Sequence, residues 1–353
     1  MSRSDRQDGS RPLIQTMEEL SAAIGVSRPT LSRYFQDPSR VSAASVRRIE
    51  EGLSTVEYVP NFFATRMNRK STGIIGVIIP YLNDLFFTNL LKAVEMAAME
   101  AGFTVITQCS HDDPAIEARA VETFLSMSVD GALVAPLGDR SDARAHTRLD
   151  ARLPYILMDS RPHTLPQMDY VGTDHPRSTR LIVDYLCDAG DPPAFLAMPG
   201  TNFNALERER AYVDRMESLG HEPIVIGTKP ENDADHYESH GFAVLDDLFS
   251  RGLHTQRSIL CANDRVAIGA LAAAARHGLD PGGASRGGLR IAGHDDYPLC
   301  PFTTPSLTTV AQDVAAIGRN AVRLLTEKIH AKSQRTEPAL LLFEGVLKVR
   351  QSA

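Results

Sequence analysis

Apolar residues at helical spacing predict three short helices near the start of the chain. Thr16 followed by Glu19 fits a capping box that opens the first helix. Ser27 can cap the second helix, and Ser42 can cap the third. Because only a few residues separate the first two helices, we expect a helix-turn-helix within residues 14–58.

From residue 73 onward, apolar runs typical of buried strands alternate with amphipathic segments typical of helices. The runs are GIIGVIIP, FTVITQC, GALVAPL, YILMDS, PAFLAMPG, PIVIG, SILCAND and RIAGHDD. This alternation predicts an α/β fold with doubly wound parallel sheets. Eight or more strands predict two such sheets in series. We expect residues 1–13 to form a disordered arm and residues 59–72 a linker with helical potential.

Charge is unevenly distributed along the 353 residues, whose net charge is −7. Residues 1–72 hold 11 Lys and Arg against 8 Asp and Glu, a balance of +3, which leaves −10 for the remainder. A mildly basic head on an acidic body is compatible with nucleic acid as a partner.

The cysteines and the N-terminus indicate a reducing compartment. Cys109, Cys187, Cys261 and Cys300 lie far apart and form no CxxC pair, which favours free thiols over a disulfide framework or a zinc site. The start, MSRSDRQDGSRP, lacks the apolar core of a signal peptide. No apolar run approaches the roughly 20 residues that a membrane span needs. We expect a cytoplasmic protein without a membrane partner.

The second predicted helix, in VSRPTLSRYFQD, carries residues suited to DNA. In a helix-turn-helix this helix enters the major groove. Ser27 and Thr30 lie in its first turn, where hydroxyl and backbone N–H groups can meet phosphate. Arg33 shares a side with Pro29 and can donate two hydrogen bonds to a guanine. The alternative is a surface helix with solvated arginines.

The order of motifs along nearly the whole chain resembles the lactose-repressor family of bacterial transcription regulators. The head carries LSAAIGVSRPTLSR, and a linker of the form Y-x-P-N-x-x-A follows as YVPNFFATRM. The body continues with IIGVIIP, NDLFF, DGALVAP, MDSRP, ANDRVAIG, GHDDYP and PSLTTVAQD. The resemblance implies a periplasmic-binding-protein-like body at residues 73–353. One lobe would span about 73–172 plus 304–333, and the other about 173–303 plus 334–353.

The resemblance implies a DNA-contacting set in the head and hinge. Its members are Thr16, Ser27, Arg28, Pro29, Thr30, Arg33, Tyr34, Asn61, Ala64 and Met67. Met67 stands where the family places a leucine that wedges into the minor groove, and methionine is slim and adaptable enough to do the same. The alternative role of Met67 is a core methionine.

For the body, the resemblance implies an effector site between the lobes. The expected residues are Asn83, Phe86, Phe87, Asp159, Arg208, His236, Asn263 and Asp295. Carboxylates and amides at strand ends can accept hydrogen bonds from sugar hydroxyls. Helix capping and Asx-turns are the alternative, above all for Asp264 and Asp296. For Arg208, which can offer a fork of donors to a ligand, the alternative is a surface ion pair.

Three positions depart from the family pattern. Ala211 replaces a glycine, and His236 and His294 stand where relatives have aromatic residues. These histidines favour a polar effector, a carbohydrate or sugar acid rather than a purine. His236 and His240 have i, i+4 spacing but no clear third ligand, so we expect no metal and no cofactor.

No catalytic signature is present: GxSxG, GxGxxG after a strand, a Walker loop and HExxH are all missing. We therefore expect a regulator and not an enzyme. The preferred function is a repressor that binds a pseudo-palindromic operator in double-stranded DNA as a homodimer, under control of a small-molecule effector. The rival is a solute-binding protein for carbohydrate transport. The ending KVRQSA lacks heptads that would build a tetramer, which favours a dimer.

Overall fold

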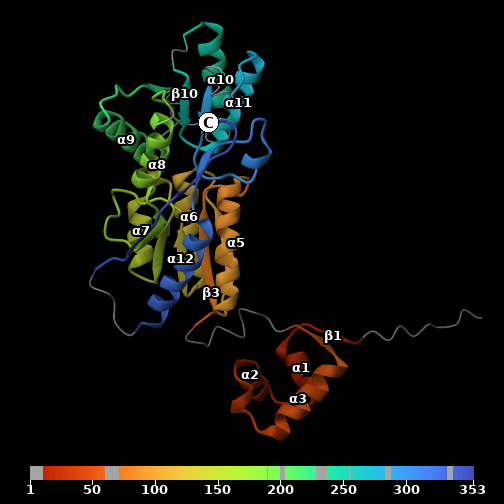
Figure 1. Ribbon diagram of the computed structural model, residues 1–353. Helices are drawn as coiled ribbons and strands as arrows, with labels where there is room; N and C mark the ends of the chain where they lie inside the picture. Colours follow the sequence, from red (N-terminus) through yellow and green to blue (C-terminus); the bar gives the residue numbers. More distant parts are fainter. Residues whose placement is uncertain are drawn as a thin grey trace, which may run out of the picture. The chain divides into compact units, whose positions relative to one another are not determined.

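The computed structural model describes residues 11–59, 71–188, 190–198, 203–227, 237–253, 256–282, 288–331 and 337–353. The chain divides into two compact units at residues 72 and 73, a head and a body (Figure 1). No helix in these ranges is long and apolar enough to cross a membrane.

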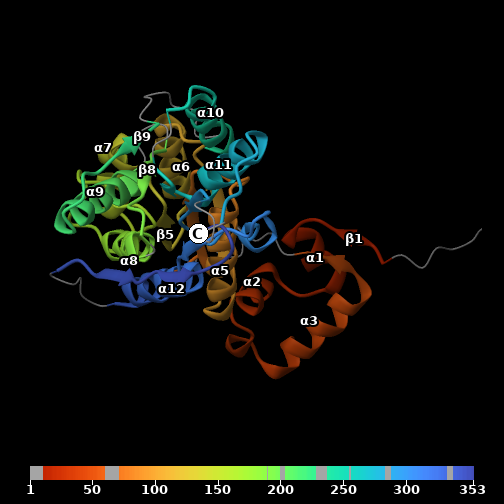
Figure 2. The ribbon, with the colours of Figure 1, turned by 45° about the horizontal axis from the view of Figure 1, so that its top comes forward.

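The head consists of three helices and a two-stranded parallel sheet. The helices, which can be followed separately in Figure 2, are α1 (Met17–Ile24), α2 (Arg28–Gln36) and α3 (Ala43–Thr55). A 3-10 turn (Pro38–Arg40) follows α2, and β1 (Leu13–Ile14) pairs with β2 (Glu57–Tyr58). Fully buried Leu20, Leu31 and Ile49 form the centre of its core.

Local capping explains where the head helices begin. Thr16 accepts a hydrogen bond from the Glu19 amide at 3.2 Å, and the Glu19 carboxylate accepts one from the Thr16 amide at 3.3 Å. The capping box is therefore confirmed. Ser42 caps α3 as predicted. Ser27 makes no cap bond, because its hydroxyl instead lies 2.9 Å from that of Thr30.

The disordered arm predicted for residues 1–13 was wrong at its last residues, and residues 1–10 lie outside the described residues. Leu13 was assigned to residues 1–13, yet it lies in β1, and the Glu57 amide donates to the carbonyl of Pro12 at 3.0 Å. The backbone partners of this segment lie more than 40 residues away. Local polarity does not reveal such a long-range pairing.

The first lobe of the body is built on a six-stranded parallel sheet of order β13-β7-β6-β5-β3-β4. Its strands are β3 (Ile74–Ile79), β4 (Thr104–Cys109), β5 (Gly131–Val134), β6 (Tyr155–Met158), β7 (Tyr170–Thr173) and β13 (Leu340–Phe343). Strands β3, β5, β6 and β7 are fully buried, as expected for a sheet covered on both faces.

Helices cover both faces of this sheet. Helices α5 (Leu85–Glu100) and α12 (Val314–His330) pack together on one face, and α6 (Pro114–Met127) lies on the other with α7 (Ala143–Asp150) beside it. Gly76 of β3 allows this close approach, since a Cβ there would lie 2.4 Å from the Phe124 ring of α6.

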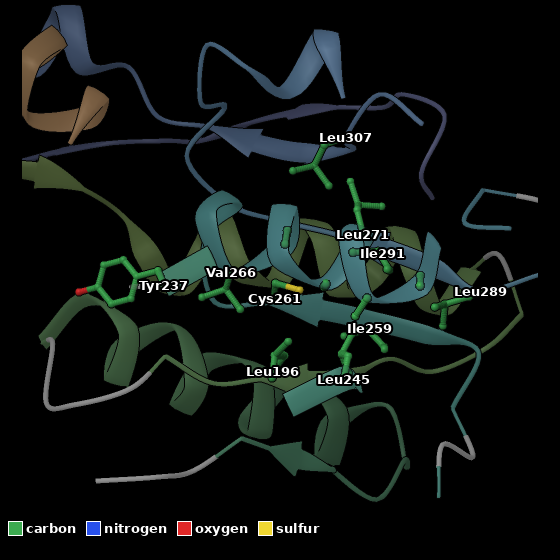
Figure 3. Close-up of a cluster of buried hydrophobic side chains, with 14 of the residues drawn as sticks. Leu196, Tyr237, Leu245, Ile259, Cys261, Val266, Leu271, Leu289, Ile291 and Leu307 are labelled. Carbon is green, nitrogen blue, oxygen red and sulfur yellow. The ribbon is translucent and has the colours of Figure 1, made fainter. Parts of the chain in front are cut away.

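The second lobe carries a four-stranded parallel sheet of order β11-β10-β8-β9. Its strands are β8 (Ala194–Leu196), β9 (Val225–Ile226), β10 (Ser258–Cys261) and β11 (Arg290–Ala292). Helices α8 (His175–Asp188) and α9 (Phe203–Ser218) pack on one face; α10 (Tyr237–Ser250) and α11 (Asp264–Arg276) pack on the other. Figure 3 shows the second of these layers, with Leu245, Val266 and Ile291 in its core. Two doubly wound parallel sheets confirm the predicted fold class.

The chain crosses between the lobes near the antiparallel strands β12 (Thr309–Ala311) and β14 (Val346–Lys348). Residues 334–353 were assigned to the second lobe, and this was wrong for Leu340–Phe343. Strand β13 instead pairs with β7 in the first sheet, and the chain returns to the second lobe only afterwards. An apolar run such as LLLF fits the edge of either sheet, so its pattern alone cannot choose between them.

Candidate functional site

Helix α2 presents its charged residues outward. Arg28, Pro29 and Arg33 are exposed, whereas Leu31 is fully buried and holds the helix to the head. Proline is tolerated in this first turn because its missing N–H would have no helical partner there. Ser27 is exposed and Thr30 half-buried at the same end.

Besides Ser27 and Thr30, three of the expected DNA contacts have partners inside the head. Arg28 Nε lies 2.9 Å from Glu18 Oε1 of α1, and both side chains are more than 60% exposed. Tyr34 is half-buried, with its ring 5.3 Å edge-on from that of Phe35. Burial and the Glu50 carboxylate raise the pKa of Tyr34. Thr16 serves the capping box.

Some expected positions lie outside the described residues. They are Asn61, Ala64 and Met67 of the linker, and His236 of the body.

A pocket lies between the two lobes, at the carboxyl ends of their strands. Asp159 follows β6, Asn263 follows β10 and Asp295 follows β11. Three further expected residues line the pocket from helices, namely Phe86 and Phe87 of α5 and Arg208 of α9, which makes six in all. This is the place where wound sheets bind ligands.

Asn83 does not line this pocket. It is exposed, and its neighbour Asp84 lines the pocket in its place. Asp84 is the N-cap of α5, where its carboxylate accepts from the Phe86 amide at 2.9 Å, so the cap turns this side chain inward. A signal was present in the sequence, since aspartate is a favoured N-cap residue.

The buried centre of the site is an ion pair between Arg208 of α9 and Asp295. Arg208 Nη2 donates to Asp295 Oδ1 at 2.9 Å, Nη1 donates to the Ala262 carbonyl at 2.8 Å, and Nε donates to His175 Nδ1 at 3.3 Å. The guanidinium donors of Arg208 that were expected to bind a ligand are therefore occupied by other groups of the protein. The surface ion pair considered as the alternative is also wrong, because Arg208 is 5% exposed.

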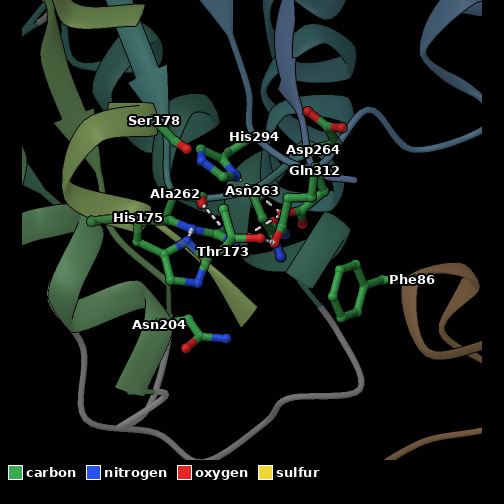
Figure 4. A network of polar contacts seen from close by, with 12 residues as sticks. Phe86, Thr173, His175, Ser178, Asn204, Ala262, Asn263, Asp264, His294 and Gln312 are labelled. Atoms are coloured by element: carbon green, nitrogen blue, oxygen red, sulfur yellow. Dashed lines mark hydrogen bonds and ion pairs between the residues drawn. The ribbon is translucent and has the colours of Figure 1, made fainter. Parts of the chain in front are cut away.

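Asp295 collects several donors. Gln312 Nε2 donates to it at 2.6 Å, and the Gln312 Oε1 atom accepts from Thr173. Figure 4 shows Thr173, Gln312 and His175 in this network, with Phe86 across the open side of the pocket. Burial alone would raise the pKa of Asp295, but Arg208 and His294 hold it below its usual value. Asp295 has φ of 121°, a conformation that non-glycine residues rarely adopt.

Two buried histidines contact the Arg208–Asp295 ion pair. The rings of His175 and His294 lie 5.8 Å apart, and both side chains are buried. Burial and the neighbouring Arg208 lower the pKa of both, that of His294 to about 4. His294 stands where relatives have an aromatic residue and was expected to affect the choice of effector. It contacts Asp295, with His294 Nδ1 3.2 Å from Asp295 Oδ1, and does not line the pocket.

Asp159 occupies a different environment. Its carboxylate is buried and accepts a hydrogen bond from Asn204 Nδ2 at 3.0 Å. Burial raises the pKa of Asp159 to about 7, with Arg208 opposing the shift and Asp295 and Asp84 adding to it. Asp159 also has a positive φ, of 65°.

The remaining wall carries two further carboxylate–arginine pairs. Asp84 Oδ2 lies 3.2 Å from Arg265 Nη1 of α11, and Arg140 forms an ion pair with Asp112. Tyr237, one residue beyond the expected His236, lines the pocket with the Arg265 guanidinium 4.9 Å from its ring centroid.

Sequence reasoning missed several lining residues, chiefly Asp84, Asp112, Arg140, Asn204, Tyr237 and Gln312.

Structural roles account for the other strand-end residues. Asp264 is fully buried and accepts from Thr309 Oγ1 at 2.6 Å and from the Tyr297 amide at 2.7 Å. Asp296 pairs with Arg350 at 2.7 Å. Asn263 caps α11 through its Oδ1 while lining the pocket. The capping role considered as the alternative therefore applies to Asn263, whereas Asp264 and Asp296 bind residues far away in the sequence.

An exposed recognition helix on a small head and a polar pocket between two wound lobes define a DNA-binding regulator with a ligand-binding body. Comparisons with known proteins agree. Residues 16–61 match bacterial regulatory proteins of the lacI family, and residues 183–353 match a periplasmic binding protein-like domain. The chain thus carries a lacI-family DNA-binding domain followed by a periplasmic binding protein-like domain, as its motifs predicted.

Individual relatives resemble the chain over nearly its whole length. The transcriptional repressor CytR of Escherichia coli strain K12 is 27% identical over 94% of this chain and 95% of its own length. The lac repressor dimer bound to operator and the anti-inducer ONPF has a TM-score of 0.81 at 24% identity, covering 96% of this chain and 98% of its own. The regulator CelR in complex with cellobiose has a TM-score of 0.68 at 24% identity, covering 96% and 99%. These relatives are regulators of transcription and not enzymes.

Proposed function

We propose that this protein is a transcriptional repressor that binds an operator as a homodimer and responds to a sugar bound between its lobes. The observation that carries the proposal is a buried hydrogen-bond network. It connects the pocket to the segments that cross between the lobes. Asp295 lines the pocket, accepts from Gln312 directly after β12, and through Gln312 reaches Thr173 at the end of β7. A ligand that moves Asp295 thereby moves the segments that set the tilt of the lobes.

In the head, the proposed DNA contacts begin with α2. Arg33 and Arg28 offer donors to bases and phosphates, Pro29 offers an apolar ring, and Ser27 and Thr30 offer hydroxyls. Thr16 and Tyr34 lie at the edge of this surface. Asn61, Ala64 and Met67 of the linker complete the set, with Met67 as the minor-groove wedge.

In the body, the ligand would bridge the lobes. Asp84 and Asp159 of the pocket wall belong to the first lobe, and Asn204, Asn263 and Asp295 belong to the second. The Asp84–Arg265 pair and the hydrogen bond from the Leu85 amide to Tyr297, at 2.9 Å, already join the lobes at the pocket rim. A ligand controls DNA binding only as far as it prefers one lobe arrangement, and tenfold in operator affinity requires about 1.4 kcal/mol of preference.

Known relatives support the partners. CytR is a repressor, the lac repressor structure is an operator-bound dimer, and the CelR structure holds cellobiose. We infer a homodimer, an operator and a carbohydrate effector by this similarity, and action in the cytoplasm, where the DNA lies. A solute-binding transport protein has no use for the DNA-binding head at residues 16–61.

A gel shift with the DNA upstream of its own gene tests the proposal. We expect binding at nanomolar to micromolar protein that weakens by about a decade or more between low and moderate salt, because phosphate contacts release counterions. Arg33→Ala should weaken it. A panel of neutral sugars should change the affinity in one direction. No detectable shift at micromolar protein would refute the proposal.

A further inference from the structure

The pocket holds one more carboxylate than it has arginine partners among the described residues. Its wall presents Asp84, Asp112, Asp159 and Asp295. Three of them have an arginine within ion-pair distance: Asp84 has Arg265, Asp112 has Arg140, and Asp295 has Arg208. Asp159 has no such partner in the described part of the chain.

The guanidiniums of Arg208 and Arg265 are already engaged by other groups. Arg208 donates hydrogen bonds to Asp295, to the Ala262 carbonyl and to His175. Arg265 divides its donors between Asp84 and Glu238, the latter at 2.7 Å and 2.9 Å. Within the described residues, the Asp159 carboxylate therefore accepts from one neutral donor, Asn204 Nδ2.

Asn204 adds a second acceptor at the same place. Its Oδ1 atom is buried and has no hydrogen-bond partner within the described residues, although the side chain is only 6% exposed. An unpartnered buried acceptor is destabilising unless a ligand supplies a donor. Because Asn204 Nδ2 bonds Asp159, the free Oδ1 and the carboxylate lie on one wall of the pocket.

We propose that the ligand presents a protonated amine to Asp159 and Asn204, and that Asp159 is the residue that selects an amino sugar over the parent sugar and over a sugar acid. This inference rests on the proposed function for the identity of the pocket. An ammonium group supplies three donors and no acceptor, and it neutralises the one surplus charge. A hydroxyl group would satisfy the hydrogen bonds but offer no charge to favour the ionised carboxylate. A carboxylate on the ligand would double it.

The aromatic residues of the pocket suit the same ligand. Phe86, Phe87 and Tyr237 line it, and aromatic faces attract both cations and the apolar face of a sugar ring. Tyr237 already makes one such contact, with the Arg265 guanidinium 4.9 Å from its ring centroid.

Calorimetric titration of the full chain at pH 7 tests this inference with three matched sets of probes. Each set contains an amino sugar, its parent sugar and the corresponding uronic acid, in the gluco, galacto and manno configurations. We expect the amine of at least one set to bind ten-fold or more tightly than its parent, and the acid of every set to bind weakest. Equal affinity of amine and parent, tighter binding of an acid, or no binding of any amine overturns the inference.

Variants assign the selectivity to Asp159. Asp159→Asn keeps the shape of the side chain and should reduce the preference for the amine at least ten-fold while the parent sugar still binds. Asn204→Ala should weaken amine binding with Asp159 intact. Asp188→Asn removes an exposed carboxylate at the end of α8 and should leave the preference unchanged. An amine preference that survives Asp159→Asn contradicts the inference.

The operator gel shift separates this inference from the proposed function. Amine binding without any operator binding would refute the repressor and leave the inference standing. Operator binding that responds to a neutral sugar, with no amine bound, would support the repressor and refute the inference of an amine ligand.

Discussion

Arg208 of α9 and Asp295 at the end of β11 form an ion pair, with 2.9 Å between Nη2 and Oδ1 and with side chains only 6% and 14% exposed. Removing one member of such a pair leaves an uncompensated buried charge. The pair therefore supports the fold as well as the pocket, and loss of ligand binding in an alanine variant has two explanations.

Stability measurements separate these two roles. We expect Arg208→Ala to lower the free energy of unfolding by about 3–5 kcal/mol, as is typical for a broken buried pair. Urea denaturation of the body checks this value. Arg177→Ala, which breaks an exposed pair with Glu344, is the control and should change it by less than about 1 kcal/mol. Equal effects of both variants would show that the burial of Arg208 does not matter.

Asp159 should make the protein less stable as pH rises. Its pKa is raised to about 7 by burial, and by Asp295 and Asp84 against Arg208 and Asn204, so the folded protein binds this proton more tightly than the unfolded chain does. The stabilisation is complete below about pH 4, the usual aspartate range, and is lost as pH rises to about 7. Ligand-free Asp159→Asn should then be more stable than wild type at pH 8, by up to about 4 kcal/mol.

Urea denaturation between pH 4 and 8 measures this difference. The two proteins should converge toward pH 4. Asp264, whose pKa burial also raises to about 7, titrates in the same range in both proteins and cancels in the comparison. A difference that does not vary with pH would show that Asp159 does not titrate there.

A buried triad holds the pocket loop of the first lobe. His146 Nε2 lies 2.8 Å from Glu117 Oε1, its Nδ1 lies 2.6 Å from the Tyr155 hydroxyl, and Glu117 Oε2 accepts from the Leu137 amide at 3.1 Å. Leu137 lines the pocket. We expect Glu117→Ala to cost about 3 kcal/mol or more of stability and to weaken ligand binding. The variant leaves the buried His146 Nε2 without its partner and leaves the Leu137 amide with Ser141 Oγ alone.

The same triad offers graded controls. Tyr155→Phe removes one hydrogen bond and should cost about 0.5–1.5 kcal/mol. Glu122→Ala, on the exposed side of the same helix and paired with Arg148, should change stability by less than about 1 kcal/mol. Chemical denaturation and calorimetric titration report the two effects. A larger loss from Glu122→Ala than from Glu117→Ala would contradict this view.

Local signals in the sequence were sufficient for much of the fold. The Thr16 capping box and the alternation of apolar runs depend on neighbouring residues only, and they predicted α1 and the two wound sheets. The position of β13 and the pairing of β1 with β2 depend on contacts between distant segments. Local patterns carry no information about such partners.

The position of the pocket could be predicted from the sequence, but the partners of its side chains could not. Strand ends located Asp159, Asn263 and Asp295, because the fold class places these ends together. Whether a side chain is free for a ligand depends on neighbours from other elements. Arg208 is occupied by Asp295, and the pairing of Arg140 with Asp112 involves two loops far apart in sequence. Only the folded chain shows these partners.

The exposed pair between Arg28 and Glu18 should weaken DNA binding slightly. It joins α2 to α1 at 2.9 Å and competes with phosphate or base for the Arg28 guanidinium. We expect Glu18→Gln to raise operator affinity a few-fold at low salt, in line with the small energy of a surface pair. Glu51→Gln, an exposed glutamate on α3, changes the net charge equally and is the control in the same gel shift. Equal gains from both variants would indicate a general charge effect.

Pro29 should select bases without supporting the fold. It is exposed in the first turn of α2, where its apolar ring can meet a thymine methyl and where a longer polar side chain would instead offer hydrogen bonds to a base edge. We expect Pro29→Gln to change which operator bases are preferred while the thermal midpoint of the head stays nearly constant. Leu31→Ala, two residues on but fully buried, should instead lower head stability by about 2–5 kcal/mol. Selection of bound sequences from a randomised operator compares the variants, and an unchanged preference in Pro29→Gln would exclude this residue from base readout.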